Sequence, residues 1–490
     1  MSKFNKKNDS SKNISFEGGV VYSKTVEDNW INFMFSSMMT PTFYESAQEQ
    51  QSRFVGLTKA MLDKYGPEFV AKAAHYSRNV MGMRSISAMT AALLNDVSFE
   101  GKREFYRKYF HRPDDVSEVF GAVGMLGKKV SHGLMRGAKD YIEGLDAYRM
   151  GKYKMIGHDF NMYDLINLTH AHSKTVDLLK KGDLPVPETW ETVISACHDD
   201  RQKREAWMHL VSEDKLGYLA LIRNIRNIIN CDPGTEFIED VLASKIVNEE
   251  AIRKSMVFPY TIYVANKQMD TITAKIEDAL NKALEISLGN VPKFEGSSLS
   301  IIDVSGSMCS SFGGSRISCK EISAIYAAQF NKASFSNDIG IGDNDVILFS
   351  TEAEFLDFGN IGRITEMVDY INRKYLGGST FIDKVYPKVR KHYDRILLFS
   401  DMQIAAQHGG YFGPYSKNNN KSFDSWFEEY QRKYGKSHVY SFDLANYDNQ
   451  VVRTVGDISY MTGLNDKVFM FMKMQEQGKS LVDEIKNYKY

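Results

Sequence analysis

Three short stretches of the 490-residue sequence place oxygen-bearing side chains where they could bind a metal ion. The stretch DVSGS contains Asp303, Ser305 and Ser307. Thr380 ends the stretch LGGST, and Asp401 directly follows RILLFS. Magnesium prefers oxygen ligands in octahedral geometry and retains several waters. These five side chains therefore predict a site for Mg²⁺, or another divalent cation such as Mn²⁺, whose coordination is completed by an acidic protein partner.

The positions of these residues depend on the elements before them. LSIID leads directly into DVSGS, while Gly377 and Gly378 permit a tight loop before Thr380. Further apolar runs are DVILFS from 345, HVYSFDL from 438 and KVFMFM from 467, with a helical pattern in SCKEISAIYAAQFNKAS. Apolar strands alternating with helices predict a parallel or mostly parallel sheet that is covered on both faces. Ligands of such sheets bind at the carboxyl ends of the strands.

The three stretches together resemble the metal-ion-dependent adhesion site of von Willebrand factor A domains, which has D-x-S-x-S, a distal Thr and a distal Asp. A D-x-S-x-S stretch alone is weak evidence, because Asp and Ser are common in loops. Here all three parts follow in order at the ends of the expected elements. The alternative is a structural role, in which Asp303 and Ser305 cap the following helix and Thr380 satisfies a turn.

Residues 26 to 290 show a different pattern. Apolar residues recur at intervals of three and four, as in FVGLTKAMLDKYG, and breakers such as RPDD and NCDPGTE interrupt them. This periodicity predicts a series of amphipathic helices. Such helices bury their apolar faces against neighbouring helices, which favours an α-solenoid of the HEAT kind. The Pro/Gly/Ser-containing stretch VPKFEGSS, residues 291–298, marks a domain boundary. We predict a flexible tail over 1–17, a helical repeat domain over 18–292 and an α/β domain over 298–490.

Composition limits the class of protein. The 61 Lys and Arg residues balance 62 Asp and Glu residues, which excludes a globally basic nucleic-acid coat but leaves room for a local basic surface. The four cysteines form no C-x-x-C, which argues against a zinc cluster or a disulfide scaffold. No run approaches 18 apolar residues, and the start lacks the apolar core of a signal peptide. We therefore expect a soluble, cytoplasmic protein without a membrane span.

The stretch 101–154 is the local basic candidate. It contains twelve Lys and Arg residues against seven acidic residues, with eight aromatic residues between them. Cations that neutralise phosphates, together with rings that stack on unpaired bases, are what recognition of single-stranded RNA requires. Composition alone favours the alternative of a solvated helix face with aromatic residues in the core.

A family resemblance adds weight to RNA. MRGAKDYIEGLDAYRMGKYKMIGHDFNMYDLINLTHAHSK, with LGYLALIRNIRNI from 216 and VFPYTIYVANKQ from 257, resembles signature stretches of the Ro autoantigen family, the TROVE-domain proteins. In that family an α-helical HEAT-like repeat ring precedes an α/β (Rossmann-like) von Willebrand factor A domain. The resemblance implies binding of small noncoding (Y-like) RNA and of single-stranded ends of structured or misfolded RNA. In bacterial relatives it also implies an exoribonuclease partner such as polynucleotide phosphorylase.

The same resemblance assigns RNA contacts residue by residue. Lys152 lies in GKYKM with Lys154 beside it, and His170 closes NLTH. Where the family often has another Arg after KYK, this sequence has MIG, so that contact is missing or comes from Arg149. Family stretches and the basic stretch complete the predicted set: Lys152, Lys154, His170, Arg149, Arg136, Lys139, Arg84 and Arg223. The last two could instead hold helix ends through charge-assisted bonds, and His170 could be structural.

Three rival functions follow from the same residues. A serine hydrolase is disfavoured because no G-x-S-x-G elbow and no general base can be named. A nuclease is disfavoured because no cluster of carboxylates suited to two metals occurs. The remaining rival is a protein-interaction or assembly module, such as a scaffold or virion component, that uses the metal site without RNA. We therefore predict a binding protein and no enzyme.

Overall fold

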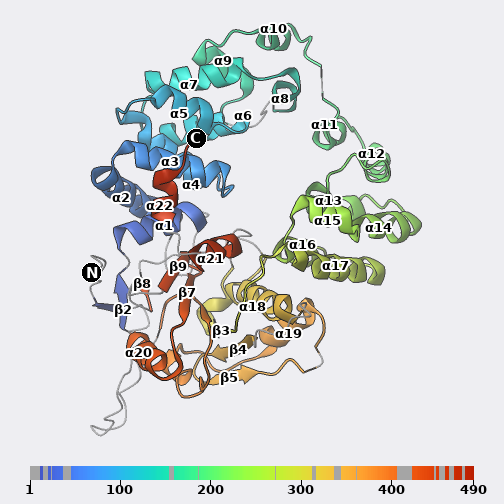
Figure 1. The fold of residues 1–490 in the computed structure, drawn as a ribbon. Coiled ribbons are helices and arrows are strands. Elements are labelled where there is room, and N and C mark those ends of the chain that lie inside the picture. The colour runs from blue at the N-terminus through green and yellow to red at the C-terminus, as the bar shows by residue number, and fades with distance from the viewer. Residues whose placement is uncertain are drawn as a thin grey trace. The chain divides into compact units, whose positions relative to one another are not determined.

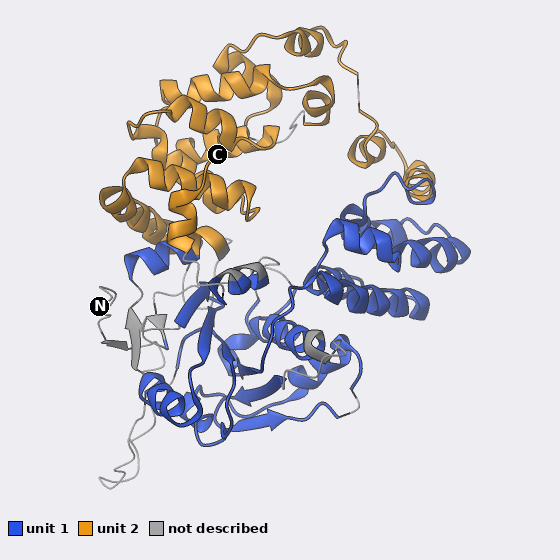
Figure 2. Cartoon of the chain, viewed as in Figure 1, with its two compact units in different colours: residues 1–32, 40–46, 211–477 blue, residues 33–39, 47–210, 478–490 orange. Residues whose placement is uncertain are grey.

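The computed structural model describes residues 12–14, 20–23, 25–36, 46–153, 159–185, 187–270, 272–311, 316–335, 344–359, 361–404, 422–445, 449–451, 458–462, 468–476 and 481–490. The chain divides into two compact units (Figure 2). Unit 1 comprises 1–32, 40–46 and 211–477, and unit 2 comprises 33–39, 47–210 and 478–490. The units do not coincide with the predicted domain limits, because the helices of 211–292 belong with the sheet and residues 478–490 belong with the early helices.

The described part of unit 2 is helical (Figure 1). Helix α1 (Val26–Ser36) spans both units, and the last two residues of α12 (Asp200–Ser212) belong to unit 1. The others are α2 (Ala47–Tyr65), α3 (Pro67–Asn79), α4 (Ser85–Leu93), η1 (Leu94–Asp96), α5 (Lys102–Tyr109), α6 (Pro113–Met125), α7 (His132–Glu143), α8 (Ala147–Lys152), α9 (Met162–Thr169), α10 (Lys174–Lys181), α11 (Trp190–Ser195), α12 (Asp200–Ser212) and α22 (Leu481–Asn487). Helices α3, α5, α7 and α9 pack in succession, as do α4 and α6. Helices that are two apart in the chain therefore contact each other, as expected for stacked helix pairs.

Local chemistry explains where these helices begin and how closely they pack. The side chains of Ser131, Asp146 and Ser173 each accept a hydrogen bond from the backbone three residues ahead, which caps α7, α8 and α10. Helices α5 and α7 approach each other at Gly137, where a Cβ atom would lie 2.6 Å from Tyr106 Cβ. Only a residue without a side chain permits this crossing.

Unit 1 contains the remaining helices and a six-stranded sheet. The helices that precede the sheet are α13 (Tyr218–Asn230), η2 (Phe237–Leu242), α14 (Ala243–Ile246), α15 (Glu249–Ser255), α16 (Pro259–Lys267), α17 (Ala274–Ser287) and η3 (Leu288–Asn290). The sheet has the order β5-β4-β3-β6-β7-β9, with β3 (Ser298–Asp303), β4 (Asn344–Phe349), β5 (Ala353–Leu356), β6 (Arg395–Ser400), β7 (His438–Asp443) and β9 (Ile458–Thr462). Its other helices are η4 (Gly306–Cys309), α18 (Cys319–Phe335), α19 (Ile364–Arg373), η6 (Ile382–Lys384), α20 (Phe423–Tyr434) and α21 (Val468–Glu476).

The sheet confirms the mostly parallel prediction. Every pair is parallel except β4 with β5. Leu299 and Ile301 of β3 join a buried cluster with Trp426 of α20, while α18 packs on β3 and β4 (Figure 1). One expectation was wrong: the run KVFMFM from 467 forms most of helix α21, and the edge strands are β5 and β9.

The two ends of the chain depart from the sequence interpretation. Within the predicted 1–17 tail, residues 12–14 form β1 (Lys12–Ile14), which pairs with β2 (Val20–Ser23), and β2 pairs with β8 (Asn449–Gln450). The rest of that tail lies outside the described residues. Helix α22 packs against α3 and buries Leu481 and Ile485. Across the described ranges, no helix combines the length and apolar character needed to span a bilayer.

Candidate metal centre and candidate RNA interface

The predicted metal ligands gather at the carboxyl ends of three neighbouring strands. β3 lies between β4 and β6 and ends at Asp303, whose side chain is fully buried. Asp303 Oδ1 accepts a hydrogen bond from the Ser305 backbone at 2.9 Å, and its Oδ2 accepts one from Ser400 Oγ at 2.7 Å. The hydroxyls of Ser305 and Ser307 lie 3.3 Å apart. Asp401 follows β6 directly and is 3% exposed.

The loop that carries Thr380 is attached to the end of β4. Ser350 Oγ donates to the carbonyls of Gly377 and Ser379 at 2.8 and 2.7 Å, and the Phe381 backbone donates to the Ser350 carbonyl. Gly377 has φ of +101°, and a Cβ there would collide with the hydroxyl oxygen of the threonine that follows Ser350. Because β4 pairs with β3 in register up to Asp303, this attachment brings buried Thr380 to the same edge of the sheet.

Electrostatics at this edge favour a cation. Burial, followed by the charge of nearby Asp401, raises the pKa of Asp303 to about 7. Two carboxylates and three hydroxyls form a hard oxygen donor set of the kind that magnesium accepts. No group of three or more His, Cys, Asp and Glu side chains suited to a metal occurs within the described ranges, so the hydroxyls are needed. The donor set therefore fits the predicted ion.

The alternative, in which these residues only cap a helix and complete a turn, agrees with the structure only in part. Asp303 does hold the turn through the Ser305 backbone, but the Ser305 side chain makes no capping bond to η4. Sequence reasoning missed two supporting hydroxyls, Ser350 and Ser400, which hold the Thr380 loop and Asp303. Their only sequence signal is that each is the polar residue at the end of an apolar strand run.

The predicted RNA-binding residues differ in their surroundings. Arg136 of α7, Arg149 of α8 and His170 are exposed, and none makes an ion pair with another described residue. His170 ends α9 in the left-handed conformation, with φ of 51°. Lys152 lies 3.4 Å from Glu191, and Lys139 lies 3.7 Å from a glutamate one turn ahead. Arg223 is exposed on α13 in unit 1. Lys154 lies outside the described residues.

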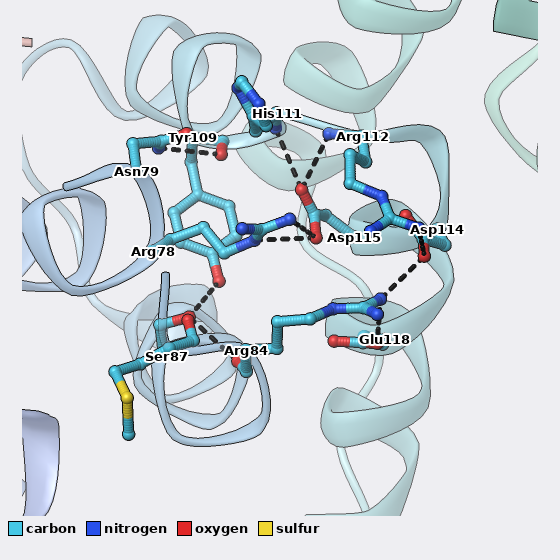
Figure 3. A network of polar contacts seen from close by, with 11 residues as sticks. Arg78, Asn79, Arg84, Ser87, Tyr109, His111, Arg112, Asp114, Asp115 and Glu118 are labelled. Atoms are coloured by element: carbon cyan, nitrogen blue, oxygen red, sulfur yellow. Dashed lines mark hydrogen bonds and ion pairs between the residues drawn. The ribbon is translucent and has the colours of Figure 1, made fainter. Parts of the chain in front are cut away.

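Arg84 has the structural role that the sequence left open. Its guanidinium binds Asp114 at 2.7 Å and also Glu118, so it joins the start of α4 to α6 (Figure 3). In the same network, Arg78 Nε donates to Asp115 Oδ1 at 2.8 Å, and Asp115 is 2% exposed. Figure 3 shows these charges turned toward one another. A buried charge is tolerated when it is paired and hydrogen-bonded, which accounts for this cluster.

The basic stretch 101–154 is less free than its composition indicates. Seven of its cations form ion pairs within the protein: Arg103, Arg107, Lys108, Arg112, Lys128, Lys139 and Lys152. Five of its eight aromatic residues are buried in the core: Phe105, Tyr106, Tyr109, Phe110 and Phe120. Tyr148 is 54% exposed beside Arg149, and Tyr163 of α9 is 45% exposed. Available cations and rings therefore concentrate on α7 to α9.

Comparison with known proteins supports a relationship to Ro. A family model for the TROVE domain matches residues 179–293. The match covers the later part of the predicted helical domain and confirms, over these residues, the resemblance to TROVE-domain proteins that the sequence indicated. A comparison with curated proteins gave no match.

A solved structure extends the likeness beyond the TROVE match. The crystal structure of the Deinococcus radiodurans RO (RSR) protein resembles this chain with a TM-score of 0.63 and 13% identity. The similarity covers 93% of this chain and 100% of that one. At this identity the likeness shows the fold, and it confirms the predicted class of helical repeats followed by an α/β domain.

Proposed function

We propose that this protein binds RNA in the manner of Ro proteins, taking small noncoding (Y-like) RNA and single-stranded ends of structured or misfolded RNA. The observation that carries the proposal is the exposed surface of α7 to α9. There Arg136, Arg149 and His170 have no ion-pair partner among the described residues, and Tyr148 and Tyr163 expose their rings. Such cations neutralise phosphates, and exposed rings stack on unpaired bases. The TROVE domain and the Ro fold support the same function.

Fluorescence anisotropy with a single-stranded RNA and with a structured hairpin, repeated across salt concentrations, tests the proposal. Arg149→Glu and His170→Ser should weaken binding, and each lost phosphate contact should reduce the salt slope by about one. Arg201→Glu is the matched control, because Arg201 is exposed on α12 and already pairs with Glu205. If the wild type binds neither RNA at low salt, the rival interaction module is the better description.

We also propose that the site built by Asp303 and its neighbours binds Mg²⁺ or Mn²⁺ and recruits an acidic protein partner. The bound cation would supply an open coordination position for a partner carboxylate. The protein's own contribution is to fix the ligands: Ser400 holds Asp303, and Ser350 holds the Thr380 loop. Calorimetric titration with Mg²⁺ tests the site, since Asp303→Asn should abolish binding. Asp443→Asn is the control, because Asp443 is equally buried at the end of neighbouring β7.

The proposed exoribonuclease partner needs a separate test. Polynucleotide phosphorylase should co-sediment with the purified protein in the presence of RNA. Digestion of the RNA would release an RNA-bridged partner, whereas EDTA would release one held by the cation. Retention under both treatments would exclude both routes.

A further inference from the structure

Helix α18 begins with a buried lysine whose partners are unusual. Lys320 is 8% exposed, and its ammonium donates to the carbonyls of Asn372 and Lys374, each at 2.9 Å. Both carbonyls lie at the end of α19, where backbone oxygens lack helical partners and carry partial negative charge. Burial lowers the pKa of Lys320, so the charged form is retained at a cost. The free-energy cost of burying this ammonium indicates that its two hydrogen bonds serve a structural or functional purpose.

The two elements that Lys320 joins lead to different parts of the cation site. Its own helix continues the chain from Ser305 and Ser307, and the Ser310 carbonyl accepts from the first residue of α18. Of the two carbonyls that it binds, that of Asn372 lies in the last turn of α19 and that of Lys374 begins the segment 374–380, which ends at Thr380. At its far end this segment is held by Ser350. At its near end the Leu376 carbonyl accepts from two backbone groups beyond β4, and the Lys374 ammonium pairs with Glu354 of β5 at 2.6 Å. Lys320 binds this end of the segment from the other side, that of α18.

We propose that Lys320 is a positioning residue of the cation site. It fixes the segment that carries Thr380 against the segment that carries Ser305 and Ser307, without touching the ion. The inference rests on the proposed cation site. A metal site requires its ligands to be held within about 0.5 Å of the productive geometry by groups around them. An ammonium with two backbone acceptors joins α18, which follows the loop of Ser305 and Ser307, to the start of the segment that leads to Thr380, and in this way sets their spacing.

The test measures Mg²⁺ and Mn²⁺ affinity of the full chain by calorimetric titration, with thermal unfolding of each variant. Lys320→Met should weaken cation binding roughly tenfold to a hundredfold, as losses of supporting contacts around metal ligands do. Lys332→Met is the matched control: Lys332 lies on the same helix, is 21% exposed and pairs with Glu285. It should lose stability to a similar extent and keep its cation affinity within about twofold of wild type.

The outcomes separate this inference from the proposed function. If Lys320→Met binds cations like the wild type while Asp303→Asn does not, Lys320 has no positioning role and the site itself stands. Equal losses of affinity in Lys320→Met and Lys332→Met also overturn the inference, because the effect is then general destabilisation. If Asp303→Asn keeps full affinity, the proposed site itself is wrong. Should Lys320→Met fail to fold, Lys320→Gln takes its place, because glutamine retains a neutral donor. Its cation affinity is then compared with those of the wild type and Lys332→Met in the same way.

Discussion

Replacing Asp303 by Asn is expected to stabilise the cation-free protein at alkaline pH. The ordinary pKa of the Asp303 carboxyl is 3.8, and burial together with Asp401 raises it to about 7 in the folded protein. A raised folded-state pKa means that ionisation favours unfolding. The contribution of Asp303 to stability is therefore complete below about pH 4, falls as the pH rises, and is lost above about pH 7. Each pKa unit is worth about 1.4 kcal/mol, so the loss approaches ~4 kcal/mol at pH 8.

Asparagine does not ionise and keeps an acceptor for the Ser305 backbone, so the variant escapes this loss. Chemical unfolding of both proteins in EDTA between pH 5 and 9 measures the difference in stability, which should grow in favour of the Asp303→Asn variant as the pH rises. Saturating Mg²⁺ should reverse the order, because a cation that binds only the folded wild type adds stability. A difference between the two proteins that is constant with pH, or equal stabilisation of both by Mg²⁺, contradicts the reasoning.

Three further predictions concern backbone positions and the end of the chain. Gly377→Ala should weaken Mg²⁺ binding about tenfold in calorimetry, because φ is +101° and the methyl group meets a threonine hydroxyl, whereas Gly378→Ala meets nothing within 4 Å and should not. Gly137→Ala should destabilise by about 1–3 kcal/mol in denaturant unfolding, whereas Gly56→Ala in open space should stabilise by about 0.5–1 kcal/mol; equal signs would contradict this. Deleting 481–490 should speed amide exchange in α3 and α5 and leave exchange in the sheet unchanged.

The grouping of the five proposed metal ligands at one edge of the sheet could be predicted from sequence because their placement is set locally. Each proposed ligand lies within a few residues of the end of an apolar strand or of a glycine pair, and parallel strands bring their carboxyl ends to one edge. The run KVFMFM failed for the opposite reason. A short apolar run is compatible with a buried strand and with a buried helix. Its surroundings decide: Phe469 stacks at 5.2 Å on Tyr326 of α18, so the run packs as a helix against a helix.

Charge was harder to interpret from sequence than apolar pattern. A sequence shows that Arg84 and Lys152 are cations but not that their partners stand 30 and 39 residues later, at Asp114 and Glu191. Counting bases therefore overstates the positive charge available to phosphate. His170 is the opposite case, a side chain that is exposed and makes no ion pair with a described residue. It stands at the left-handed end of α9, and its sequence neighbours alone do not indicate that exposure. The exposed basic surface that we propose for RNA could be predicted as a region but not as a residue set.

The limits of the domains show why a change in composition is a poor guide to packing. The change at 291–298 reports that helices give way to strands, but helix α17 before it is fastened to the helices after it. Asn281 accepts from Thr365 at 3.0 Å, and Glu285 pairs with Lys332 at 2.7 Å. At the other end, the chain returns to unit 2: Tyr488 is hydrogen-bonded to a histidine of α3 at 2.8 Å, 413 residues earlier. A cut at 291–298 would therefore remove α22 from unit 2 and α13–α17 from unit 1, so each fragment would lose part of its own core.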